Sequence, residues 1–244
     1  MSQNPLITDA PCGVLLIDKE PDMTSHDAVA ICRRQLKFKK IGHCGTLDPM
    51  ATGLLMLVIG KATKIQDLLM SEDKEYTGTM TLGITTGSQD KESDIVEEKE
   101  VPPFTDEEID AAFKKYVGPF EQTPPMVSAI KKNGVPLYKL ARKGIEVERK
   151  ARAVYVTDYE ITRTAVPEVD FKVNCSKGFY VRTYAHDIGQ DLGCGAHLSA
   201  LRRTRSGKFT VDRAMTAADL KTATAEDIKT SLIPLAEISL MRGA

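Results

Sequence analysis

The sequence of 244 residues has no tryptophan, only 6% aromatic residues and no hydrophobic run long enough to span a bilayer. Its N-terminus lacks the basic segment and apolar core of a secretory signal. The five cysteines are an odd number and form no C-x-x-C pair, so neither a disulfide framework nor a zinc site is indicated. We therefore expect a cytoplasmic protein with free thiols that contacts no membrane.

The motifs that hold common cofactors are also absent. There is no P-loop, no dinucleotide-binding fingerprint and no cluster of His and Cys at metal-ligand spacing. The composition, 42% hydrophobic and 27% charged, is that of an ordinary globular protein that can bury one full-sized core. We expect no metal and no cofactor, and the absence of these motifs fits a reaction that needs neither.

Charge is distributed unevenly along the chain. Residues 90–110 contain ten acidic residues and two lysines, so the net charge of -1 leaves the remainder at +7. Basic residues gather in 33–40, 131–152 and 202–208. Separated basic clusters suit a phosphate backbone touched at several places, although any one of them alone is more typical of a solvated helix face. The candidates for phosphate contacts are Lys131, Lys132, Arg142, Lys143 and Arg202.

Periodicity predicts an α+β protein. Segments with strand-like apolar runs or alternation are 13–18, 54–59, 75–82, 151–162 and 166–175. Segments with helical spacing or capping residues are 24–35, 60–69, 105–116, 136–143 and 180–192. Residues 85–104 indicate a long acidic surface loop, Asn133-Gly134 a turn, and the tail from Met215 a helical segment.

The stretch Gly42–Gly53 stands out because three glycines, one proline and one carboxylate crowd a loop that leads into the buried strand 54–59. Its glycines permit positive φ or close backbone approach. Pro49 biases Asp48 toward an extended conformation, so we expect Asp48 to be held in one orientation. On turn chemistry alone, an Asp before Pro is more often a turn former than a catalyst.

The run Gly42-His43-Cys44-Gly45-Thr46-Leu47-Asp48-Pro49-Met50-Ala51-Thr52-Gly53 resembles the signature of the TruB family of tRNA pseudouridine synthases. Further blocks resemble the family in the same order over about residues 12–215: 15–19 with Thr24-Ser25, 60–64, 74–76, 125–129, 176–183 and 201–203. One block departs from the pattern, since the family's D-K-P is here Asp18-Lys19-Glu20-Pro21.

The resemblance implies a catalytic set. Asp48 is the expected nucleophile, and a charge-assisted bond from Arg182 is expected to keep it ionised inside an apolar pocket. Periodicity alone makes Tyr76 a core aromatic, whereas the resemblance places it against the target uracil. Tyr180 is a candidate for the pocket wall and for proton handling. Both nucleophilic attack by Asp48 and a glycal route remain open.

The resemblance also implies contacts to RNA. His43 matches the family position that fills the space left by a flipped nucleotide, although a lone histidine is more often structural. Leu201 is expected to contact the base, and Lys64 to lie close to the active site. Lys19 is expected to be among the residues that bind the RNA substrate. Residues 124–152 match an inserted thumb-like lobe that closes over tRNA.

These expectations combine into a mixed, mostly antiparallel sheet flanked by helices, the pseudouridine-synthase fold. We expect a catalytic domain at 1–214 and a short helical tail at 215–244 without the family's PUA domain. The expected reaction converts uridine 55 in the T-arm stem-loop of tRNA to pseudouridine, by a monomer that uses no guide RNA. Two alternatives remain open: a tRNA-binding or folding module with incidental catalysis, and a hydrolase with an Asp nucleophile that releases uracil.

Overall fold

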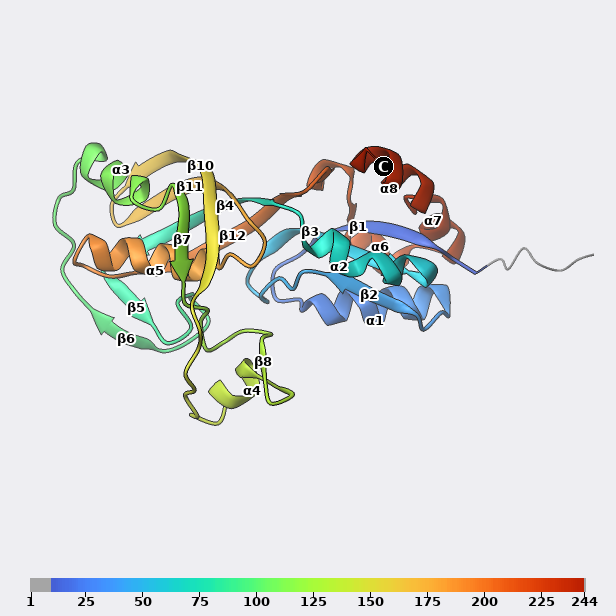
Figure 1. Cartoon of the computed structure of the whole chain (residues 1–244), viewed down its shortest axis with the longest axis horizontal. Coiled ribbons are helices and arrows are strands. Elements are labelled where there is room, and N and C mark those ends of the chain that lie inside the picture. The colour runs from blue at the N-terminus through green and yellow to red at the C-terminus, as the bar shows by residue number, and fades with distance from the viewer. Residues whose placement is uncertain (1–9, 244) are drawn as a thin grey trace, which may run out of the picture. The chain divides into compact units, whose positions relative to one another are not determined.

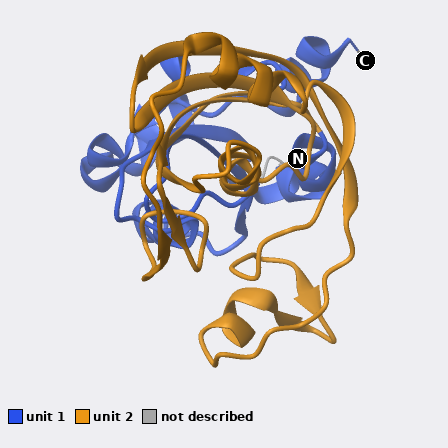
Figure 2. Cartoon of the chain, turned by 90° about the vertical axis from the view of Figure 1, so that its left-hand side faces the viewer, with its two compact units in different colours: residues 1–71, 207–244 blue, residues 72–206 orange. Residues whose placement is uncertain are grey.

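The computed structural model describes residues 10–243, which divide into two compact units. Unit 1 comprises residues 1–71 and 207–244, and unit 2 comprises residues 72–206 (Figure 2). The chain therefore leaves unit 1 after Ser71 and returns to it at Gly207. The domain boundary expected at residue 214 stays a prediction. Among residues 10–243, no helix combines the length and the hydropathy that crossing a membrane requires.

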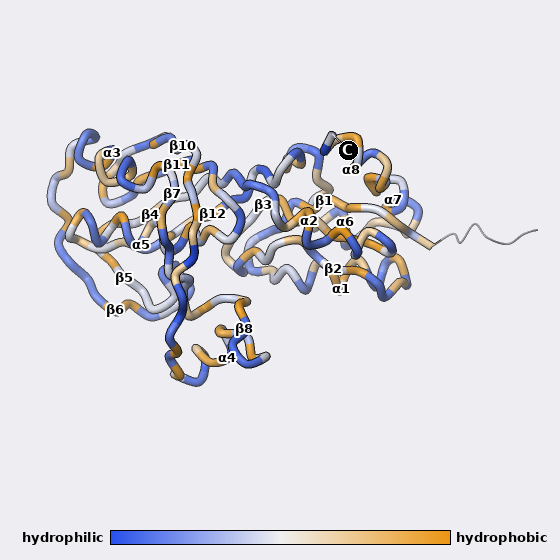
Figure 3. The backbone as a smooth tube through the Cα atoms, viewed as in Figure 1, coloured by the Kyte–Doolittle hydropathy of each residue, from blue (hydrophilic) through white to orange (hydrophobic). Residues whose placement is uncertain are grey.

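Unit 1 is built on a small mixed sheet in the order β14-β1-β3-β2. β1 (Gly13–Lys19) is antiparallel to β3 (Thr52–Ile59), which also pairs with β2 (Ile41–Cys44), and β14 (Met215–Thr216) is parallel to β1. Figure 3 shows the hydrophobic residues along β1, nearly all of which are buried. The sequence predicted β1 and β3, whereas residues 41–44 form a strand where the signature loop was expected to begin.

The helix α1 (Ser25–Leu36) begins after Thr24, as the sequence predicts. The Thr24 hydroxyl accepts from the Asp27 N–H at 3.1 Å, and the Asp27 carboxylate accepts from the Thr24 N–H at 2.8 Å, which completes a capping box. The hydrogen bonds from Thr24 hold the pKa of Asp27 below its ordinary value. The first turn of α1 is therefore rigidly defined.

The rest of unit 1 consists of short elements. These are η1 (Gly60–Ile65), α2 (Gln66–Met70), β13 (Phe209–Thr210), η2 (Val211–Arg213), α6 (Ala217–Thr222), α7 (Ala225–Thr230) and α8 (Leu235–Arg242). The helix expected over 60–69 is thus divided into a 3-10 turn and a short α-helix. Ile233 and Ile238 of the helical tail are buried with Leu54 in one apolar cluster, so the tail is part of the core of unit 1.

Unit 2 contains an antiparallel sheet in the order β12-β4-β11-β10-β7. Its strands are β4 (Lys74–Leu82), β7 (Gly118–Gln122), β10 (Arg152–Ala165), β11 (Glu168–Cys175) and β12 (Ala196–Ser206). Figures 1 and 2 show these strands curving round the helix α5 (Val181–Asp191). The alternation predicted for β4 is confirmed, since Tyr76, Met80 and Leu82 are buried while the threonines between them are partly exposed.

An aromatic cluster fills the space between this sheet and its helices. Tyr184 of α5 is fully buried, and its ring centroid lies 5.7 Å from that of Phe113 in α3 (Asp106–Lys114) and 6.0 Å from that of Phe171 in β11. Gly189 brings α5 very close to β12, because a Cβ atom there would lie 2.3 Å from the main-chain nitrogen of Ala196. The helix α5 is therefore seated directly on the sheet.

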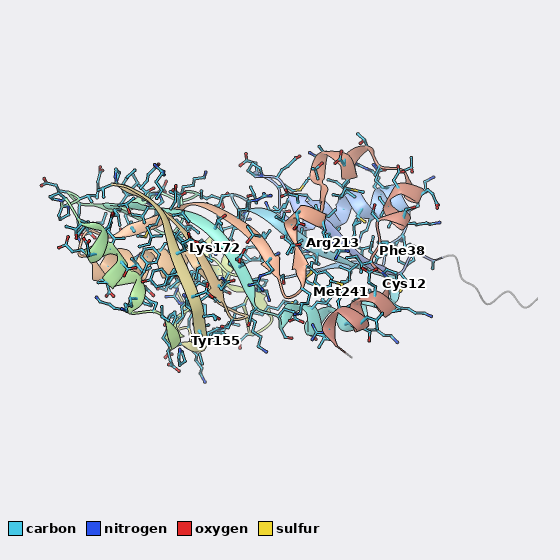
Figure 4. The ribbon with its side chains drawn as sticks, turned by 90° about the horizontal axis from the view of Figure 1, so that it is seen from above. Cys12, Phe38, Tyr155, Lys172, Arg213 and Met241 are labelled. Atoms are coloured by element: carbon cyan, nitrogen blue, oxygen red, sulfur yellow. The ribbon has the colours of Figure 1, made fainter. Side chains whose placement is uncertain are left out.

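The opposite face of the sheet is polar. Lys172 Nζ lies 3.0 Å from Glu75 Oε2, and the Tyr155 hydroxyl donates to Asp73 at 2.8 Å. Figure 4 labels Lys172 and Tyr155 on this side. The sheet thus has one packed face and one solvated face, as is common for antiparallel sheets.

Residues 85–104 do not form the simple surface loop that the sequence indicates. β5 (Ile84–Thr86) pairs with β6 (Ile95–Glu98) in a hairpin. β6 is exposed as expected, but Ser88 and Asp90 in the connecting turn are buried. The expectation was wrong because a charged, turn-rich stretch can be buried when a distant residue pairs with its carboxylate.

Residues 124–152, which we call the basic lobe, extend from the sheet of unit 2 (Figures 1 and 2). The lobe contains β8 (Lys131–Lys132), β9 (Val135–Pro136) and α4 (Leu137–Ala141). Asn133 and Gly134 have φ of +52° and +80°, which matches the two-residue hairpin turn predicted for them. The expected helix 136–143 is present but shorter.

Candidate active site

Hydrogen bonds fix the main chain on both sides of Asp48. The hydroxyl of Ser25 accepts from the Leu47 N–H at 2.9 Å and donates to the Leu47 carbonyl at 3.2 Å. The Ala51 N–H donates to the Asp48 carbonyl, and the Asp22 N–H donates to the Pro49 carbonyl, both at 3.0 Å. The partly buried Asp48 side chain therefore projects from a loop whose path is held by the start of α1.

Lys19 is buried beneath the same loop. Its side chain is 1% exposed, and its Nζ donates to the carbonyl oxygens of Glu20 at 2.9 Å, Met23 at 2.6 Å and Pro49 at 3.0 Å. The ammonium group thus ties the segment after β1 to the residue that follows Asp48. This burial does not fit the direct RNA contact that the sequence suggested for Lys19.

The glycines of the signature stretch are required for different structural reasons. Gly45 and Gly53 have φ of +78° and +95°, a region that L side chains rarely adopt. Gly42 instead permits close approach, because a Cβ atom there would lie 2.8 Å from Oε1 of Gln66. The Nε2 group of Gln66 donates to the main-chain carbonyl of His43 at 3.1 Å. Gln66 is the first residue of α2, and its hydrogen bond therefore fixes the position of β2. Sequence reasoning did not single out this residue.

In unit 2, Tyr76 and Leu201 lie on the same buried face of neighbouring strands. Tyr76 in β4 is opposite Arg203 in β12, and Gly78 is opposite Leu201. Tyr76 and Leu201 are therefore diagonal neighbours on adjacent strands. Tyr76 is 9% exposed and Leu201 is 8% exposed. Arg203 shares this face and is 2% exposed. Arg203 therefore does not lie at the surface, where both interpretations of the basic cluster 202–208, phosphate contact and solvated face, would place it.

Tyr180 immediately precedes α5 and is held by a reciprocal amide contact. Its N–H donates to Oε1 of Gln122 at 2.8 Å, and its carbonyl accepts from Nε2 of Gln122 at 3.1 Å. Gln122 lies in β7 and is 1% exposed. Nothing in the pattern of residues 118–122 marks this glutamine, so sequence reasoning missed it.

Arg182 lies in the first turn of α5, where a positive charge needs an acidic partner. Its Nη1 lies 3.3 Å from Oδ2 of Asp90 and donates to the Ser88 carbonyl at 2.9 Å. Its Nη2 donates to the Val127 carbonyl at 2.7 Å. The acidic partner that the resemblance implies is Asp48, and sequence reasoning did not identify Asp90, whose turn-like surroundings carry no distinguishing signal.

The catalytic candidates are divided between the two units. Asp48 belongs to unit 1, whereas Tyr76, Tyr180 and Arg182 belong to unit 2. The contact between Asp48 and Arg182 and their common pocket stay predictions. Within residues 10–243, no group of three or more His, Cys, Asp and Glu side chains is arranged to hold a metal ion.

Most of the candidate RNA contacts lie at the surface. Arg202 is partly exposed in β12, and the exposed residues are Lys64 in η1 and Lys131, Lys132, Arg142 and Lys143 in the basic lobe. The guanidinium carbon of Arg142 lies 5.6 Å from the ring centroid of Tyr138, within cation–π range. These positively charged side chains therefore lie wholly or partly at the surface.

Comparisons with known proteins identify the family of the chain. Residues 33–181 match the N-terminal domain of the TruB family of pseudouridylate synthases, and residues 182–238 match the tRNA pseudouridylate synthase B C-terminal domain. The chain is 56% identical over 223 residues to tRNA pseudouridine synthase B of Opitutus terrae, which covers 91% of this chain and 92% of that protein. It is 46% identical over 225 residues to the protein of the same name from Syntrophotalea carbinolica, with 92% and 74% covered.

Solved structures show the same similarity. A chain in a crystal structure of a Cbf5-Nop10-Gar1 complex superposes with a TM-score of 0.73 at 29% identity, covering 98% of this chain and 68% of that one. A chain of an H/ACA RNP bound to a substrate RNA containing 2'-deoxyuridine gives a TM-score of 0.69 at 26% identity, with the same coverage. The family models and the α+β fold define a pseudouridine synthase, which is an isomerase. The chain belongs to the TruB family.

Proposed function

We propose that this chain isomerises uridine 55 in the TΨC loop of tRNA to pseudouridine, with Asp48 as the nucleophile. The observation that carries the proposal is the loop around Asp48, whose main chain is fixed on both sides while the residue stays partly exposed. The two relatives named tRNA pseudouridine synthase B support tRNA as the substrate. The proposed enzyme acts as a monomer in the cytoplasm on free tRNA, without a guide RNA.

The reaction rearranges bonds within one nucleotide. The bond between N1 and C1′ breaks, the uracil turns, and a bond forms between C5 and C1′. C5 then loses its proton to a base, and N1 takes up a proton, so the product is an isomer of the substrate. The Asp48 carboxylate either attacks an electrophilic carbon or stabilises the charge that develops there. Arg182 keeps this carboxylate ionised and oriented, because a charge-assisted hydrogen bond favours the charged form. Tyr180 serves as a pocket wall and handles the proton.

A uridine inside a folded loop must leave its stack before Asp48 can reach it. In the proposed complex, His43 fills the space that the nucleotide leaves. Tyr76 stacks on the uracil, and Leu201 adds an apolar contact. Lys64, Arg202 and the basic lobe contact phosphates, which makes binding dependent on salt.

Tritium release tests this proposal. The substrate is a tRNA transcript labelled with tritium at C5 of uridine, since C5 must lose its hydrogen when it becomes the glycosidic carbon. We expect the native protein to release about one tritium per tRNA, as a single flipped target requires, and Asp48→Ala to release none. Asp212→Ala, which removes an exposed carboxylate of unit 1, is the control and should behave as the native protein does.

Three other outcomes contradict the proposal. If the native protein binds tRNA tightly but releases no tritium, the chain is a tRNA-binding module and not an enzyme. Free uracil among the products indicates a hydrolase. Equal release by the native protein and by Asp48→Ala would show that Asp48 is not the nucleophile.

A further inference from the structure

The ring of His26 lies against the ring of His43 in unit 1. The two ring centroids are 5.3 Å apart and the ring planes meet at 77°, an edge-to-face arrangement. His26 lies in the first turn of α1 and His43 lies in β2, two elements that run side by side in Figure 1. The proposed function gives His43 a role but gives none to His26.

His26 projects from a rigid part of the fold. It lies between Ser25, whose hydroxyl makes two hydrogen bonds to the main chain of Leu47, and Asp27, which completes the capping box with Thr24. The residue before His26 and the residue after it are therefore both anchored. The His26 side chain itself is exposed, so its ring can be changed with little effect on the core.

The main chain of His43 is also fixed. His43 pairs with Leu57 of β3, and its carbonyl accepts the hydrogen bond from Gln66. These contacts determine where β2 runs. The orientation of the imidazole depends instead on the side-chain torsions, which are set by the neighbours of the ring. His26 is such a neighbour.

We propose that His26 is a positioning residue for His43. Its ring holds the His43 imidazole in the orientation that fills the space left by the flipped uridine. This inference rests on the proposed function, because it concerns how an RNA-contacting side chain is held ready. A ring that is already oriented need not be ordered when the nucleotide leaves the stack, so the contact accelerates base flipping rather than strengthening the initial binding of RNA.

The ring contact can be tested without RNA. We would follow the imidazole C–H signals of His43 by NMR and assign them by their loss in His43→Ala. His26→Ala should shift these signals because the neighbouring ring current is removed. The matched control is Glu226→Ala, since Glu226 occupies the equivalent position of α7, where Thr224 and Asp227 form the same capping box. Unchanged His43 signals in His26→Ala would overturn the inference.

The consequence for the reaction needs single-turnover tritium release at saturating tRNA. We expect His26→Ala to slow release about fivefold to tenfold, in line with the loss of one aromatic pair. His26→Phe should recover most of the rate, because it keeps a ring at this position. In the His43→Ala background, His26→Ala should cause no further loss. The Kd for tRNA should change by less than about twofold.

The outcomes separate this inference from the proposed function. If the native protein releases no tritium, this result contradicts both the proposed function and the role of His26 that rests on it. A native protein that is active, while His26→Ala keeps the native rate, overturns only the role of His26. The same holds if His26→Ala slows the reaction equally with and without the His43 ring.

Discussion

Arg182 and Asp90 form an ion pair inside unit 2, with 3.3 Å between Nη1 and Oδ2 and with side chains that are 3% and 2% exposed. The same guanidinium donates to the Val127 carbonyl, which belongs to the basic lobe. One side chain of α5 thus joins the turn after β5 to the base of the lobe. Because both charges are almost fully buried, each helps to compensate the other.

Asp90→Ala should lower the free energy of unfolding by about 1.5–3 kcal/mol, because it removes the carboxylate that lies 3.3 Å from Nη1 of the buried Arg182. Urea denaturation measures this change. The control is Glu168→Ala, which removes one of the two carboxylate partners of Arg163 from an exposed ion pair in which both side chains are 50% exposed. The control should cost less than about 1 kcal/mol. An equal loss of unfolding free energy in the two variants would show that the buried Arg182–Asp90 pair stabilises the protein no more than an exposed ion pair does.

Lys19→Met keeps most of the side-chain volume but removes the three hydrogen bonds to main-chain carbonyls. We expect the free energy of unfolding to fall by at least about 2 kcal/mol, since one buried and two partly buried carbonyls lose a charged donor. Lys221→Met is the control, because Lys221 forms an exposed ion pair with Glu20 at 3.2 Å. Its effect should stay below about 1 kcal/mol. Similar urea midpoints for the two variants would contradict the role assigned to Lys19.

Asp187 makes the stability of unit 2 dependent on pH. Burial and the nearby Asp191 raise the pKa of Asp187 from its ordinary value of 3.8 to about 6. The folded state therefore binds this proton more tightly than the unfolded state. The ionised carboxylate destabilises the fold above about pH 6, and this penalty disappears as the pH falls through 6 toward 4.

Asp187→Asn should accordingly raise the urea midpoint at about pH 8 and leave it nearly unchanged at about pH 4, where the native carboxyl is protonated. The control is Asp212→Asn, which alters an exposed carboxylate of unit 1. A gain of equal size at both pH values would mean that the Asn side chain improves packing and that the charge of Asp187 is not responsible.

Local signals explain which parts of the fold could be predicted. The start of α1 follows from Thr24 and Asp27, because a capping box is a pattern of neighbouring residues. The strand β4 follows from its alternation, and the end of α5 follows from Gly193, which has φ of +82°. In each case the residues that determine the element lie within it or beside it.

The missed features depend on residues far apart in the sequence. Charge alone places Lys19 and Asp90 at the surface. Lys19 is buried because three carbonyls converge on it, and Asp90 is buried because Arg182 pairs with it. The signature loop could be located from its glycines and Asp48, whereas the partners that fix it could not.

The measurement that tests the central claim most directly compares tritium release from two labelled tRNA transcripts that differ only at position 55. One transcript has uridine at this position and the other has cytidine. The account predicts release of about one tritium per tRNA from the first transcript and none from the second, because a single uridine is flipped and isomerised. Equal release from both transcripts, or release from neither, would contradict the claim that this chain converts uridine 55 to pseudouridine.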